Sequence, residues 1–117
     1  MKSLQIGIVP RKLPRPGHHA LAVRDLVAVV QNRFDALTRA GGLTSDWQRL
    51  QFDAMGAFVQ SQKHFVALHA EILAVIQSNK VLFASLRLAS LDMSQAIAHL
   101  RDLIGAIANA MQDVERN

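Results

Sequence analysis

The sequence predicts an all-α protein, a helical bundle of three main helices in which two long antiparallel helices are completed by dimerisation. Three observations predict this class. Half of the 117 residues are apolar, and alanine and leucine, which favour helices, dominate. Apolar residues recur at steps of three and four over most of the chain. Between Gly56 and Gly105 there is neither glycine nor proline, so no local signal interrupts a helix.

Residues 1–18 differ in composition from the rest, and we interpret them as a flexible basic N-terminal arm before a single helical domain at 19–117. The chain has 13 basic and 9 acidic residues. Four basic residues and no acidic residue fall within 1–19, so the remainder carries nine of each and is neutral. All three prolines also lie in the arm and prevent a helix there. The basic residues of the arm are Lys2, Arg11, Lys12 and Arg15.

The boundaries of the first two helices follow from cap signals. The first helix is expected over 19–40, and Gly41–Gly42 ends it with a left-handed cap that glycine adopts easily. The second helix is expected to start with Thr44 or Ser45 as its cap. Ser45 and Gln48 have the spacing of a capping box, in which each side chain satisfies a backbone N–H of the helix end.

The second helix is expected to turn into a third near Ser78–Asn79, because the apolar flank of the heptad pattern changes side there. A single straight helix would not need that change, whereas a chain that folds back on itself would. The third helix is then expected over 81–115. Asp92 and Gln95 form a second possible capping box, so a break near Asp92 remains an alternative.

A heptad register with Met55 at position a runs without a slip to the C-terminus and places Phe58 at position d. In this register Gln62 and His69 fall on the centre line of the apolar face. A polar residue at such a position fixes register and oligomeric state at some cost in stability. We therefore expect Gln62 and His69 to be polar residues of a dimer interface. The alternative for His69 is a pH switch or a ligand contact.

Several kinds of chemistry have no support in the sequence. The absence of cysteine excludes disulfides and thiolate metal sites and fits a reducing, cytoplasmic location. There is no zinc-binding histidine motif, phosphate loop, dinucleotide fingerprint or pair of carboxylates, so we expect no metal, no cofactor and no catalytic residue. No segment reaches the roughly 18 uncharged apolar residues of a membrane span.

The remaining function is that of a non-enzymatic protein–protein interaction module, a small dimeric regulator that binds and masks another protein such as a transcription factor or a secretion component. Trp47 is interpreted as a core residue or, alternatively, as a binding hot spot. A second hypothesis is a nucleic-acid-associated protein whose basic arm contacts phosphates, with affinity that falls steeply with salt. The expected partner-binding residues are Leu4, Ile6, Ile8, Arg11, Arg15, Trp47, Phe52 and Phe58.

Overall fold

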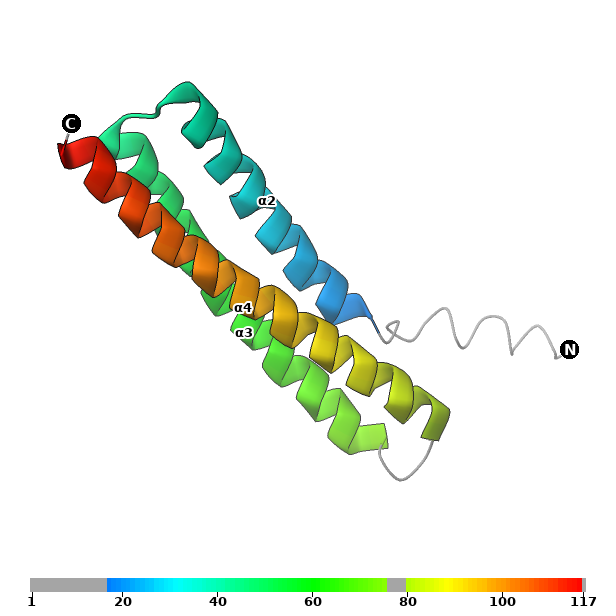
Figure 1. Ribbon diagram of the computed structural model, residues 1–117. Coiled ribbons are helices and arrows are strands. Elements are labelled where there is room, and N and C mark those ends of the chain that lie inside the picture. The colour runs from blue at the N-terminus through cyan, green and yellow to red at the C-terminus, as the bar shows by residue number, and fades with distance from the viewer. Residues whose placement is uncertain (1–16, 76–79, 117) are drawn as a thin grey trace, which may run out of the picture.

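Three helices pack side by side in a computed structural model that describes residues 17–75 and 80–116 (Figure 1). They are α2 (His18–Ala40), α3 (Thr44–Val75) and α4 (Lys80–Arg116). The C-terminal end of α4 lies beside the start of α3, and α2 lies along the pair they form (Figure 1). The expected all-α bundle of three main helices, two of them long, is therefore confirmed.

The turn between α2 and α3 forms as its glycines predict. Gly41 adopts the left-handed conformation, with φ 71°, and its N–H donates a hydrogen bond to the carbonyl of Leu37 at 2.8 Å. This bond satisfies one of the carbonyl groups that a helix end leaves free. The first helix therefore ends where the sequence indicates.

The start of α3 differs in its cap from the expectation. The helix begins at Thr44, which places Ser45 inside the first turn, so the expected box of Ser45 and Gln48 is wrong. Asp46 closes this end instead, because its Oδ2 accepts a hydrogen bond from the N–H of Leu43 at 3.0 Å. A carboxylate here satisfies a free backbone donor and lies at the positive end of the helix dipole.

The break between the two long helices falls where the change of flank predicts it. α3 ends at Val75 and α4 begins at Lys80, while Ser78–Asn79 lies outside the described residues. The alternative break near Asp92 is wrong, because α4 runs through this position without interruption. The carboxylate of Asp92 instead forms an ion pair with Arg24 of α2 at 3.2 Å.

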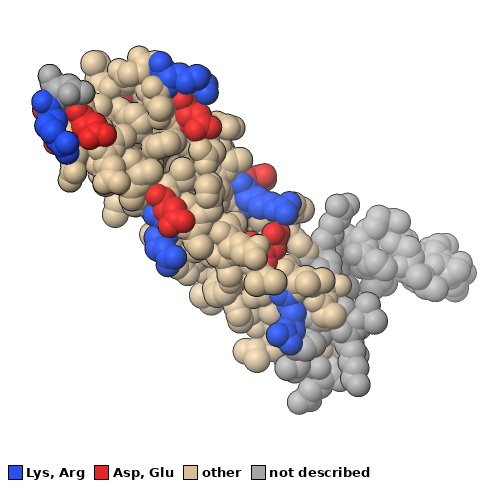
Figure 2. Space-filling model, viewed as in Figure 1, with Lys and Arg blue, Asp and Glu red and all other residues tan. Residues whose placement is uncertain are grey.

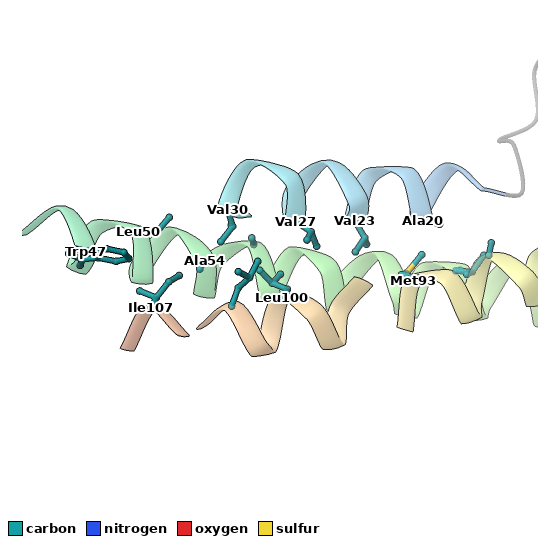
Figure 3. Close-up of a cluster of buried hydrophobic side chains, with 14 of the residues drawn as sticks. Ala20, Val23, Val27, Val30, Trp47, Leu50, Ala54, Met93, Leu100 and Ile107 are labelled. Carbon is teal, nitrogen blue, oxygen red and sulfur yellow. The ribbon is translucent and has the colours of Figure 1, made fainter. Parts of the chain in front are cut away.

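The core is a single apolar cluster between the three helices (Figure 3). α2 contributes a stripe of Ala20, Val23, Val27 and Val30, which faces the other two helices (Figure 3). On α4 the register places five residues at position d, and four of them are buried, which supports the heptad pattern there. The four are Leu86, Met93, Leu100 and Ile107, while Val114 is partly buried.

On α3 only part of the face that the heptad register predicts packs against the core. Phe58 and the next two residues at position d, seven and fourteen residues later, are partly buried against it. The exposed side chains of this helix include Met55, Gln62 and His69, the three residues assigned to position a. Its buried residues are Trp47, Leu50, Ala54, Ala57, Ser61 and Leu68. Three of these six side chains are small, which lets α3 approach its neighbours closely. Gln62 and His69 therefore lie outside the core of the single chain, and their expected place in a dimer interface stays a prediction.

Candidate functional surface

Five large apolar side chains of α3 remain exposed, and together they form the α3 stripe. Phe52 is 77% exposed and Leu73 is 73% exposed, at the two ends of this set. Isolated exposed apolar residues are normal in a soluble protein, whereas a contiguous apolar patch marks an interaction surface. The members of the α3 stripe are Phe52, Met55, Val59, Val66 and Leu73.

The spacing of the α3 stripe is that of a coiled-coil seam. Phe52, Val59, Val66 and Leu73 are each seven residues apart, and Met55 lies three residues after the first of them. Steps of three and four place side chains on one face of a helix. At the usual rise per residue the stripe is about 31 Å long. α3 therefore carries two apolar faces, one in the bundle core and one exposed along the helix.

Polar residues interrupt the stripe without introducing a charged side chain. Gln62 and His69 continue the step of seven from Met55, and both are exposed. The Nδ1 atom of His69 lies 3.0 Å from the backbone carbonyl of Phe65, to which it donates, and the two rings meet edge-on at 4.4 Å. This bond holds the imidazole against its own helix. Because Nδ1 carries the donated hydrogen, Nε2 of the neutral ring is an acceptor.

The other residues predicted to bind a partner lie in different places. Trp47 is only 3% exposed, and its ring meets that of Phe34 at 5.7 Å, so it lies in the core. Phe58 packs against the core and is half-buried, whereas Phe52 is fully available on the α3 stripe. The arm residues fall outside the described part of the chain. They are Leu4, Ile6, Ile8, Arg11 and Arg15.

A second apolar surface lies between the first and last helices, and we call it the α2–α4 groove. It has a volume of about 430 Å³. Leu21, Leu88 and Leu91 line it and are themselves exposed, while the small side chains of Ala20 and Ala89 form its floor. Gly17, where the described chain begins, also lines the groove. The arm therefore joins the bundle beside this surface.

A polar cluster joins α2 to α3 near the same end of the bundle. The Nδ1 atoms of His19 and His64 lie 2.9 Å apart, and Nε2 of His19 lies 3.0 Å from a carboxylate oxygen of Glu71. Burial, followed by the neighbouring charges of His19 and His18, lowers the pKa of His64 below its ordinary value. No local pattern in the sequence indicates this cluster, because His19 precedes His64 by 45 residues and Glu71 by 52 residues.

Charged side chains hold α2 along both of its edges. Arg33 pairs with Asp53 of α3 at 2.7 Å, and Arg24 pairs with Asp92 of α4 at 3.2 Å. Nε2 of His99 on α4 donates a hydrogen bond to the side-chain oxygen of Gln31 on α2 at 2.8 Å. Figure 2 shows basic and acidic groups close together along one face, with wide uncharged areas between them. Each exposed pair contributes little to stability, at most about 1 kcal/mol.

Nothing in the described residues points to a metal site or a membrane span. In 17–75 and 80–116 no three histidine, aspartate or glutamate side chains are grouped as metal ligands. No helix in those same ranges has both the length and the apolar character that crossing a bilayer requires. Comparison with protein-family models, with curated proteins and with solved structures finds no match to this chain.

Proposed function

We propose that this protein is a non-enzymatic protein–protein interaction module, a small dimeric regulator that binds and masks another protein. One observation carries the proposal: a bundle with a closed core still exposes large apolar side chains on two separate faces, the α3 stripe and the α2–α4 groove. A dimeric regulator needs two such faces. One face binds the second copy of the chain, so that its long antiparallel helices complete the bundle, and the other face binds the target protein.

The α2–α4 groove is the proposed target-binding surface. A groove between two helices, with small residues on its floor and leucines on its walls, accepts the apolar face of a third helix. Burying a leucine side chain fully contributes about 1.5–3 kcal/mol. Leu21, Leu88 and Leu91 therefore provide enough apolar surface for an anchor of the partner. Gly17, the first described residue, lines the same groove.

The decisive experiment is affinity capture from a lysate of the source cells with the full chain as bait, with and without nuclease. The variant Leu88→Gln removes an anchor of the groove, and Leu43→Gln is its matched control, because both leucines are 69% exposed. We expect one stoichiometric protein that survives nuclease and that is lost with Leu88→Gln alone. Equal capture by both variants and the unaltered chain would refute the groove as the binding surface.

Nucleic-acid binding through the arm remains the alternative prediction, but no observation in the described residues favours it. Beyond residue 19 the chain carries nine basic and nine acidic residues, and the ion pairs described above neutralise several of them. A neutral body gives no electrostatic footprint for a phosphate backbone. Recovery of nucleic acid with the bait, abolished by neutralising Arg11, Lys12 and Arg15, would support this alternative.

A further inference from the structure

We propose that the α3 stripe binds a second copy of this chain, so that the two α3 helices pack against each other across a two-fold axis. The inference rests on the proposed function, because it assigns the surface through which the regulator is dimeric. In this arrangement the α3 stripe binds the second copy of the chain, and the α2–α4 groove binds a different protein.

The spacing of the stripe restricts what can occupy it. Knobs-into-holes packing requires a partner helix with apolar residues at the same steps of three and four. α3 itself supplies such a helix over the whole stripe, from Phe52 to Leu73. In a two-fold interface the same patch serves both partners, so no additional complementary surface is needed.

The order of side chains along the stripe is also self-complementary. Gln62 lies at its middle, with Val59 and Val66 on either side and the bulkier Phe52 and Leu73 at the ends. This order reads nearly the same in both directions, so bulky residues meet bulky residues whichever way the second helix runs. An amide group both donates and accepts hydrogen bonds, so Gln62 can be satisfied by polar groups of an identical helix. The five members of the stripe are themselves uncharged, and the exposed Lys63 lies on the flank of the stripe, four residues after Val59.

The exposed area is close to the lower limit for a specific dimer interface. The five side chains of the stripe expose on the order of 500 Å² of apolar surface, at the upper range of the patches that monomers tolerate. Pairing two stripes removes on the order of 1,000 Å² from water, which reaches the lower bound for a specific interface. The polar residues that flank the stripe add to this area.

The test is the molar mass of the full-length chain, measured by light scattering over a range of concentrations. Val59→Glu puts a negative charge into the stripe, and Val29→Glu is its matched control, because the two valines are 52% and 56% exposed. We expect the unaltered chain and Val29→Glu to have twice the 12.9 kDa of one chain. We expect Val59→Glu to have the mass of a single chain, with unchanged helix content by circular dichroism. A single-chain mass for the unaltered protein at every concentration, or a dimeric Val59→Glu, would overturn the proposal.

A cross-linking experiment locates the interface independently. The chain has no cysteine, so a single introduced cysteine reacts without background. A short bis-maleimide should link two copies of Gln62→Cys, at the middle of the stripe, but not of Asn32→Cys, an exposed position on α2. The reverse result would contradict the proposal. Leu88→Gln should stay dimeric even where it loses the captured protein, so failure of self-association and failure of the interaction function give different results.

Discussion

The Nδ1 atoms of His19 and His64 lie 2.9 Å apart, so one ring must donate a proton to the other. His19 also lies 3.0 Å from Glu71, which is an acceptor. The contacts are satisfied when Nε2 of His19 donates to Glu71 and one of the two Nδ1 atoms donates to the other. Protonation of His64 would add a positive charge beside His19 and His18 at the first turn of α2, where the helix dipole is also positive.

The first prediction concerns pH and follows from the lowered pKa of His64. A lowered pKa in the folded state means that folding favours the neutral ring. The contribution to stability is therefore complete above the ordinary pKa of 6.5 and is lost as pH falls through the lowered folded-state pKa. We expect the melting temperature of the unaltered protein to fall more on acidification below pH 6.5 than that of His64→Gln. Thermal melts followed by circular dichroism measure both.

The control for this prediction is His69→Gln, which removes an exposed imidazole that donates only to its own helix. This variant should keep the pH dependence of the unaltered protein. The groups that face His64 are His18, His19 and Glu71, and all three are present in both variants. Identical pH dependence in His64→Gln and the unaltered chain would show that the cluster does not respond to acid through His64.

The second prediction concerns Ser61, a fully buried residue whose hydroxyl has no hydrogen-bond partner within the described residues. A buried unsatisfied hydroxyl costs about 1–3 kcal/mol. Ser61→Ala removes that cost and leaves only a small void, so we expect the free energy of unfolding to stay the same or to rise. Ser61→Leu should lower it by about 1–3 kcal/mol, because the helices have no room for a larger side chain. Urea titrations compare the two variants, and a clear loss of stability in Ser61→Ala would contradict the account.

The third prediction compares two glycines that differ only in their backbone. A Cβ atom added at Gly41 or at Gly56 would meet no other atom within 4 Å. Gly56 lies inside α3 with helical geometry, so Gly56→Ala should stabilise the protein by up to about 1 kcal/mol. Gly41 has a φ of 71°, which other residues rarely adopt, so Gly41→Ala should destabilise it. Denaturant midpoints for the pair should move in opposite directions, and a shift in the same direction would disprove the argument.

The fourth prediction uses Trp47, the one tryptophan of the chain. Its burial against Phe34 predicts fluorescence emission at short wavelength and weak quenching by acrylamide in the folded protein. Trp47→Ala should cost about 3–5 kcal/mol because it leaves a large cavity. A tryptophan available to a partner would instead emit at long wavelength and be quenched readily. That result would restore the interpretation of Trp47 as a binding hot spot.

The helices could be predicted from the sequence because their limits depend on local chemistry. The glycine pair at 41–42 ends α2 through backbone freedom that other residues lack. The change of flank near residue 78 marks the break between α3 and α4, since the apolar side of a helix must follow the core. Both signals lie within a few residues of the feature that they predict.

The buried face of α3 could not be predicted in the same way. The large residues Phe52, Met55 and Val59 dominate the apolar pattern, and the heptad register follows them. The bundle buries Ala54 and Ser61 instead, because small side chains permit the closest approach of three helices. Large apolar residues lie on both faces of α3, Leu50 and Leu68 in the core and Phe52 outside it, so residue size alone does not identify the buried face. The buried face of α3 depends on where α2 and α4 pack against it, and no short stretch of the sequence specifies that.

The candidate surface was therefore predicted only in part. Phe52 was named as a binding residue and lies on the α3 stripe, whereas Val66 and Leu73 of the same stripe were not named. The signal that would have identified them is the width of the apolar pattern, which exceeds what one interface of a helix can bury. Gln62 and His69 are the sequence clue to the same surface, since the chain places polar groups where a face is exposed.

The proposed pairing through the α3 stripe would make the fraction of paired molecules depend on the concentration of the protein in the cell. Pairing of identical chains follows mass action, so under the proposed pairing the paired fraction rises with concentration around the dissociation constant. A change in synthesis or degradation that crosses this range would change how many molecules keep Phe52 and its neighbours uncovered. Pairing through this one face would make the exposure of the stripe depend on the abundance of the chain, without any ligand or modification.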